Sequence, residues 1–158
     1  MNDLAERPNR FPWPPVLYVS AIALAIILHF LYPLPWIGRP LSDFLFAIGW
    51  VMVAGVIALD VGAMRTLHRS KTTIMPHRGS AHLVTKGPFA ISRNPIYLAN
   101  TMLMIGVGLI SGILWFVLLA FVAAFATQKL AIEREEHHLA ARFGKAYRDY
   151  QKRIRRWI

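Results

Sequence analysis

The sequence predicts an all-α, multi-span transmembrane protein with about four spans and an amphipathic interfacial helix at its C-terminal end. Three observations lead to this prediction. Apolar residues make up 56% of the 158 residues. They gather in four runs, each close to the length that crosses a bilayer. Lys and Arg, which give a formal net charge of +10, avoid these runs and flank them. We expect a single membrane domain over residues 1–158.

The first half of the chain is predicted to hold an irregular arm and two spans. Residues 1–15 are rich in proline, which lacks the amide donor that a helix needs. The two spans fall within residues 16–64, as apolar runs over 16–31 and 41–64 with a proline-rich loop between them. Gly49, Gly55 and Gly62 lie in the second run and favour close helix contacts in lipid.

Asp60 is the one acid deep in the second run. An acid at this depth is a functional candidate by default. An ion pair with Arg65, little more than one turn further along the helix, is an equally good explanation.

The second half is predicted to hold a cytoplasmic connection, a helical hairpin and an amphipathic helix. Residues 65–94 carry six Lys or Arg and no acid. Apolar runs within 95–132 form the hairpin, with a tight turn at 111–112. The helical pattern continues past the membrane into 133–158, where apolar residues recur at steps of three or four. The apolar residues of this pattern are Leu139, Phe143, Tyr147, Tyr150 and Ile154.

Charge and composition argue against several classes of partner and of chemistry. Four spans place all three basic segments on one side, the cytoplasmic side by the positive-inside rule. The basic charge is then explained by anionic membrane lipids, and no nucleic-acid partner is expected. Cysteine is absent, which excludes disulfides and thiolate chemistry. The six histidines lack the tight spacing of a metal centre, and no metal is expected.

Two charged groups are candidates for chemistry. Asn94-Pro95 is a helix start, so Arg93 lies beside free amides that suit a carboxylate or phosphate. Alternatively, Arg93 only pins the helix to lipid headgroups. Glu133, Glu135 and Glu136 lie where the fourth span leaves the membrane, and there they can face Arg93. Such a site fits a zwitterion with an additional positive charge. Alternatively, these acids form a solvated run with basic neighbours.

Four ordered motifs carry a family resemblance over roughly residues 80–158. The motifs are Leu83-Val84-Thr85-x-Gly87-Pro88-Phe89, Ser92-Arg93-Asn94-Pro95-x-Tyr97, Ile132-x-x-Glu135-Glu136-x-x-Leu139 and Phe143-Gly144-x-x-Tyr147-x-x-Tyr150. Together they resemble the isoprenylcysteine carboxyl methyltransferase and phospholipid methyltransferase superfamily.

The resemblance implies an integral membrane methyltransferase that uses S-adenosyl-L-methionine at the cytoplasmic membrane edge. It implies that Arg93, Glu136 and His82 take part in catalysis. Carried over by position, the cofactor-binding residues are His82, Leu83, Val84, Phe89, Arg93, Asn94, Pro95, Tyr97, Glu135 and Glu136.

The methyl acceptor is expected to be a lipid or a small molecule. Eukaryotic prenylcysteine enzymes have His-Pro at Asn94-Pro95 and Tyr at Phe89, and their motif His lies one position further from Leu83 than His82 does. The resemblance therefore does not specify the acceptor. We expect a bacterial inner-membrane protein with its site facing the cytoplasm. The alternatives are a non-catalytic membrane scaffold and an NADPH-dependent enzyme similar to sterol reductases, which are much larger.

Overall fold

The computed structural model describes residues 13–70 and 83–158, and every regular element in these ranges is helical. The all-α prediction is confirmed. The elements are α1 (Trp13–Leu31), α2 (Leu41–Arg69), the 3₁₀ turn η1 (Gly87–Ala90), α3 (Pro95–Ser111), α4 (Leu114–Thr127), the π-helical turn η2 (Gln128–Ile132) and α5 (Glu133–Arg153).

The helices have the length and composition of membrane spans. α1, α2 and the continuous rod from α4 through η2 into α5 are long and apolar enough to cross a membrane. α3 is a shorter apolar helix of 17 residues, at the lower end of the roughly 17–25 that a span requires. The prediction of a multi-span helical membrane protein is confirmed, with its third span the shortest.

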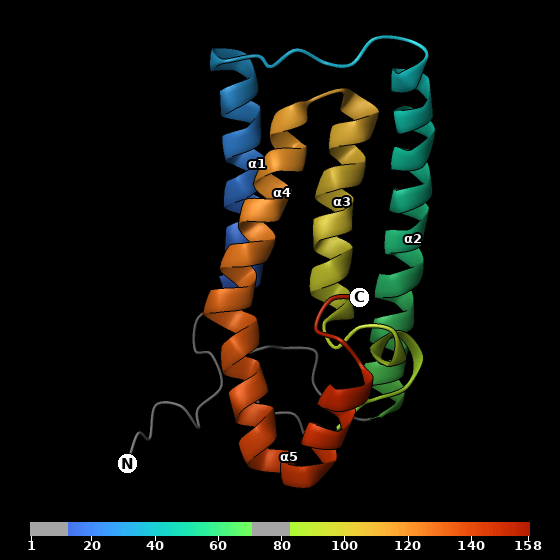
Figure 1. Cartoon of the computed structure of the whole chain (residues 1–158), viewed down its shortest axis with the longest axis vertical. Coiled ribbons are helices and arrows are strands. Elements are labelled where there is room, and N and C mark those ends of the chain that lie inside the picture. Colours follow the sequence, from blue (N-terminus) through green and yellow to red (C-terminus); the bar gives the residue numbers. More distant parts are fainter. Residues whose placement is uncertain (1–12, 71–82) are drawn as a thin grey trace.

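The four apolar helices stand side by side in the order α1, α4, α3, α2 (Figure 1). The closest approach joins α2 to α3 at two glycines. A Cβ atom added at Gly49 would lie 2.8 Å from the carbonyl oxygen of Gly106, and one added at Gly106 would lie 3.1 Å from that of Gly49. The predicted role of Gly49 in helix contact is thus confirmed. A Cβ atom added at Gly55, by contrast, would lie 3.8 Å from Cε of Met102, which is an ordinary van der Waals distance.

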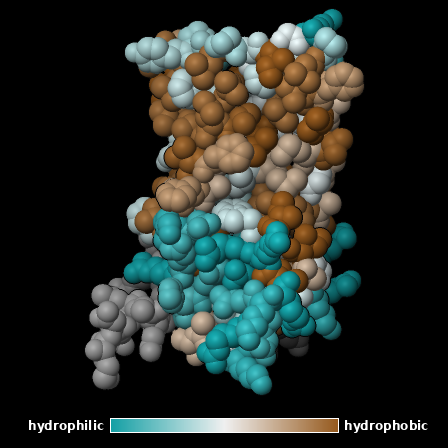
Figure 2. Space-filling model, in the orientation of Figure 1, coloured by the Kyte–Doolittle hydropathy of each residue, from teal (hydrophilic) through white to brown (hydrophobic). Residues whose placement is uncertain are grey.

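The interior of the bundle is small and the outer surface is apolar. Tyr18, Met104 and Phe116 belong to a buried cluster shared by α1, α3 and α4. Many large apolar side chains point outward instead, as Phe30 and Val51 do. Figure 2 shows this hydrophobic surface over the upper body of the molecule and a hydrophilic lower end. An apolar exterior suits a bilayer, and the polar end suits the headgroup region and water.

The chain connections divide between the two ends of the bundle. The α1–α2 loop and the turn between α3 and α4 lie at the upper end (Figure 1). The start of α1, the segment 83–94 and α5 lie at the hydrophilic lower end. The basic segments within the described ranges therefore share one side, which agrees with the topology derived from charge.

α5 is bent at Gly144, where the sequence predicted one continuous amphipathic helix over 133–158. Gly144 has φ 52° and ψ −122°, a conformation that side-chain-bearing residues avoid. The chain reverses there and returns toward the bundle (Figure 1). We call 133–143 the first arm, 145–153 the second arm and 154–158 the strap.

Asp60 stays without the partner that the sequence suggested. The structure gives no ion pair between Asp60 and Arg65. Among the described residues, the buried Oδ1 of Asp60 has no hydrogen-bond partner.

Candidate active site

The start of α3 is held by the strap. α3 begins at Pro95 with Asn94 in the N-cap position, as predicted, but the Asn94 side chain makes no capping hydrogen bond. Its Nδ2 instead donates to the carbonyl oxygen of Arg156, at 3.0 Å. The backbone amide of Asn94 donates to Oγ of Ser92, at 3.1 Å. Asn94 therefore joins two segments that are 62 residues apart.

Three further hydrogen bonds fix the strap. The Arg93 amide donates to the carbonyl oxygen of Arg155 at 3.0 Å, and the Ser92 hydroxyl donates to that of Arg156 at 3.2 Å. Nε1 of Trp157 donates to Oε1 of Gln128 in η2, at 2.9 Å. Because these bonds reach both α3 and η2, the strap closes the lower end of the bundle.

Glu136 lies between two guanidinium groups. Arg156 pairs with it at two points, with Nε 3.0 Å from Oε1 and Nη2 2.7 Å from Oε2. Nη1 of Arg93 is 3.1 Å from Oε1 on the other side. The side chains of Arg93 and Glu136 are each only 11% exposed. The structure thus brings together the two groups that the sequence expected to meet, and Glu136 is buried rather than part of a solvated run.

Glu133 is the outer member of the same cluster. Its Oε1 pairs with Nζ of Lys129 at 2.8 Å and lies 3.8 Å from Nη1 of Arg156. The hydrogen bond from Lys129 lowers the pKa of Glu133 below its usual range. Glu133 and Glu136, three residues apart on one helix, therefore present two carboxylates to the same guanidinium.

Glu135 has different surroundings from its neighbour. Its Oε1 accepts a 2.8 Å hydrogen bond from the hydroxyl of Tyr97 in α3. Burial raises the pKa of Glu135 to about 7, with a contribution from the negative charge of Glu136, while the bond from Tyr97 acts in the opposite direction. The two adjacent carboxyl groups therefore have different partners: Glu136 is paired with guanidinium groups, and Glu135 accepts a hydrogen bond from a phenol.

The second arm covers the cluster with two tyrosines. Tyr150 is 3% exposed and its hydroxyl donates to the carbonyl oxygen of Phe89, at 2.6 Å. Tyr147 is 2% exposed and lies beside Arg93 and Glu136. Burial raises the pKa of Tyr147 to about 12, so its hydroxyl keeps its proton at neutral pH. These buried tyrosines cover the side of the cluster where Arg93 pairs with Glu136.

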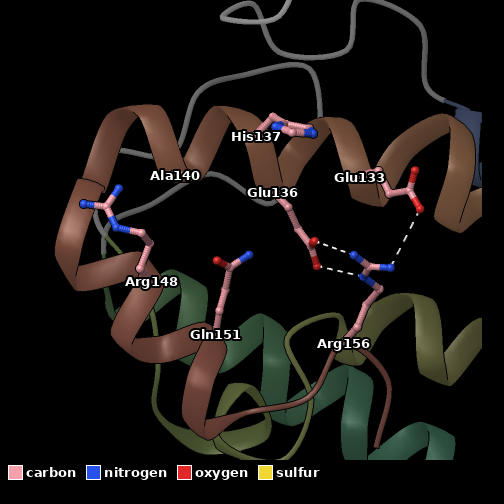
Figure 3. Close-up of a pocket in the computed structure, with 7 residues that line it drawn as sticks. All are labelled: Glu133, Glu136, His137, Ala140, Arg148, Gln151 and Arg156. Carbon is pink, nitrogen blue, oxygen red and sulfur yellow. Dashed lines mark hydrogen bonds and ion pairs between the residues drawn. The ribbon is translucent and has the colours of Figure 1, made fainter.

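A pocket of about 390 Å³ opens between the two arms and the strap (Figure 3). Gln151 projects into the space from the second arm, and Arg156 faces Glu136 and Glu133 at one end. Acidic and basic side chains both line the pocket, which suits a ligand with charges of both signs. The lining residues are Glu133, Glu136, His137, Ala140, Arg148, Gln151 and Arg156.

Comparison with known proteins identifies the family. The sequence model of phospholipid methyltransferases matches residues 44–146. The chain belongs to the phospholipid methyltransferase family. The match covers Arg93, Tyr97 and both Glu135 and Glu136, and this family lies in the superfamily that the motifs predicted.

One curated relative is the nickel-cobalt-cadmium resistance protein NccN of Alcaligenes xylosoxydans xylosoxydans. It is 36% identical over 77 residues, which are 48% of this chain and 35% of NccN. The chain thus spans about a third of the length of that relative. No solved structure matches this chain. In residues 13–70 and 83–158, no group of three or more His, Asp or Glu side chains is arranged to hold a metal ion.

The residues predicted from the family motifs are divided between the pocket and its support. Glu136 is the one that lines the pocket. Arg93 supports Glu136 from behind, Tyr97 bonds to Glu135, and Asn94 holds the strap. Pro95 is buried at the start of α3. Among the others, Leu83, Val84 and Phe89 are half-buried outside the lining, and His82 lies outside the described residues.

Sequence reasoning missed Arg148, Gln151 and Arg156. All three lie beyond the segment that the family model matches, and they reach the pocket only because the chain reverses at Gly144. A glycine within a polar helical pattern was the available signal.

Proposed function

We propose that this chain is an integral membrane methyltransferase that transfers a methyl group from S-adenosyl-L-methionine to a lipophilic or small acceptor at the cytoplasmic face. Family membership supports a membrane methyltransferase, and methyltransferases of this family generally use this cofactor. The observation that carries the proposal is the joining of Arg93, Glu136 and Arg156 at a charged pocket on the polar end of an apolar bundle.

The pocket fits the charged end of that cofactor. Its volume of about 390 Å³ lies within the roughly 300–1,000 Å³ of small-molecule sites. S-adenosylmethionine carries a carboxylate and an ammonium group, and when bound it supplies a methyl group already activated on a sulfonium. Guanidinium groups suit the carboxylate, and the carboxylates of Glu133 and Glu136 suit the ammonium.

We assign the predicted residues to binding and orientation. Arg93 and Glu136 form a rigid charged floor, since each is almost fully buried and paired. Leu83, Val84 and Phe89 would supply apolar and aromatic contacts beside it. In methyl transfer the protein has to align the two reactants and exclude water, and a preorganised floor serves that purpose.

Proton handling depends on the acceptor. A carboxylate or thiolate acceptor needs no base, whereas an amine must lose a proton. Glu135, whose pKa is about 7, is suited to accept that proton at neutral pH, and His82 is the second candidate. The hydroxyl of Tyr97 holds the Glu135 carboxyl in place.

The bundle explains why such a site would be built into a membrane protein. The polar end that carries the site adjoins an apolar exterior (Figure 2). A prenylated or phospholipid acceptor can therefore approach from the bilayer without leaving it. This route from the bilayer to the site would serve isoprenylcysteine-type acceptors and phospholipid amines alike.

Binding and methyl transfer test the proposal together. Purified protein in detergent should bind S-adenosylhomocysteine, measured by calorimetry, and should transfer labelled methyl to a component of membrane lipid extracts. Arg93→Ala and Glu136→Gln should each weaken binding by more than about tenfold, or 1.4 kcal/mol.

Asp43→Asn is the matched control, because this exposed carboxylate lies on the loop end of α2, far from the pocket. Circular dichroism and size exclusion verify that each variant is folded. Wild-type protein that binds neither S-adenosylmethionine nor S-adenosylhomocysteine would refute the proposal.

A further inference from the structure

The pocket lining holds two carboxylates, Glu133 and Glu136, and two guanidinium groups, Arg148 and Arg156, and further cations pair with the same carboxylates from outside the lining. Glu136 is shared by Arg93 and Arg156, and Glu133 is paired with Lys129. Three cations thus face two carboxylates. Arg148, which also lines the pocket, adds a fourth. An excess of positive charge in the cluster around a pocket favours an anionic group on the ligand.

Arg156 has donors left for such a group. Its Nε and Nη2 are bonded to Glu136. Among the described residues, the partner of Nη1 is Glu133 at 3.8 Å, which is beyond the roughly 2.7–3.2 Å of a hydrogen bond. A guanidinium carries two N–H donors on this nitrogen.

Arg156 is also more accessible than Arg93. Its side chain is 29% exposed and lines the pocket, whereas the Arg93 side chain is 11% exposed and lies behind Glu136. Of the two guanidinium groups on Glu136, only that of Arg156 borders the open space (Figure 3).

The position of Arg156 is fixed by its backbone. Its carbonyl oxygen accepts hydrogen bonds from Ser92 and Asn94, and the carbonyl oxygen of Arg155 accepts one from the Arg93 amide. Trp157 is anchored to Gln128. With the two-point pair to Glu136, these bonds hold the guanidinium in place before any ligand binds, which lowers the entropy cost of binding.

We infer that Arg156 is the residue of this pocket that binds the carboxylate of the ligand's amino-acid end. The inference rests on the proposed function, and it places the binding contact in the strap, outside the segment that the family model matches. Arg93 then has a positioning role, because its guanidinium pairs with Glu136 and its backbone amide bonds to the strap.

The test compares two ligands that differ only in the carboxylate, S-adenosylhomocysteine and its decarboxylated form. Calorimetry in detergent gives both dissociation constants for each variant. Wild-type protein should prefer the carboxylated ligand by at least about tenfold, the range of a charge-assisted hydrogen bond. In Arg156→Gln the preference should fall below about twofold, with the affinity for the decarboxylated ligand nearly unchanged.

Arg155→Gln is the control, because it removes the same charge from the neighbouring exposed side chain and should keep the preference. Arg156→Lys keeps the charge without the two-point geometry, and its preference should fall between the others. It also keeps the test usable if Arg156→Gln does not fold.

Each contrary result has its own meaning. A preference that survives in both Arg156 variants overturns the inference and leaves the proposed function intact. Equal losses for both ligands would mean that Arg156 only supports the strap, which also overturns it. Wild-type protein that binds neither ligand refutes the proposed function itself.

Discussion

Arg156 and Glu136 form a two-point ion pair, with Nε–Oε1 and Nη2–Oε2 distances of 3.0 and 2.7 Å. The pair fastens the strap to the first arm. Because Arg93 reaches the same carboxylate, three segments distant in the sequence are joined at one acidic side chain.

Replacing this carboxylate is expected to destabilise the fold. Glu136→Gln removes the carboxylate that Arg93 and Arg156 share and leaves only Glu133, 3.8 Å from Arg156, as a counter-charge. The loss of one partner in a buried ion pair costs about 3 kcal/mol. Thermal unfolding in detergent measures the change. Glu133→Gln, three residues earlier and more exposed, should have little effect. Equal losses in the two variants would contradict this role for Glu136.

Stability should fall as the pH rises through neutrality because of Glu135. Its pKa is raised from 4.5 to about 7 in the folded protein, where Glu136 and the hydroxyl of Tyr97 face it. The contribution of Glu135 is therefore complete below about pH 4.5 and is lost as the pH rises through about 7. Melting temperatures between pH 5 and 8 should decline less steeply in Glu135→Gln. An unchanged slope would argue against the raised pKa.

One substitution at Asn94 distinguishes the observed strap contact from the helix-capping role that the sequence predicted. Aspartate is as good a helix N-cap as asparagine. It has no Nδ2 donor, however, and would direct a carboxylate at the carbonyl oxygen of Arg156. Asn94→Asp should therefore destabilise the strap by about 1 kcal/mol, the net contribution of one lost hydrogen bond, since the Arg156 carbonyl keeps its bond from Ser92. Faster proteolysis after the basic residues of the strap would report it. Wild-type resistance would favour the capping role.

Gly144 should be intolerant of a side chain for conformational reasons alone. A Cβ at this position meets nothing within 4 Å, yet φ is 52°. Gly144→Ala should therefore cost about 1–3 kcal/mol through backbone strain. Gly38→Ala is the control, because a Cβ there is equally free and φ is not in the left-handed region. Similar melting temperatures for the two variants would exclude strain at Gly144.

The contact between α2 and α3 contains a second glycine that should not tolerate a side chain, here for steric reasons. A Cβ at Gly49 would lie 2.8 Å from a backbone oxygen that cannot move aside easily. Gly49→Ala should cost about 1–3 kcal/mol by overpacking. Gly55→Ala lies on the same helix with ordinary contacts and should be neutral or slightly stabilising. Thermal unfolding of the two variants decides whether the close approach exists.

The sequence predicted the features that depend on local pattern and charge. Apolar runs predicted the spans, and their basic flanks predicted which segments share an end of the bundle. Arg93 and Glu136 could be expected to meet because both lie where a span leaves the membrane.

The features that depend on distant contacts could not be predicted. Asn94-Pro95 is a good local helix start, yet a partner 62 residues away takes the asparagine side chain. The apolar spacing of Phe143 and Tyr147 continues across Gly144, so nothing in the periodicity marks the reversal. Without knowledge of that reversal, nothing in the sequence distinguishes Arg148 and Arg156 from ordinary surface charges.

The strap also sets an order of assembly. Residues 154–158 leave the ribosome after all four apolar helices, and their partners at Ser92, Asn94 and Gln128 are already made. A nascent chain that has inserted its helices still lacks Arg156 and hence one wall of the pocket. The pocket is therefore completed late in biogenesis, as a step separate from insertion of the helices into the bilayer.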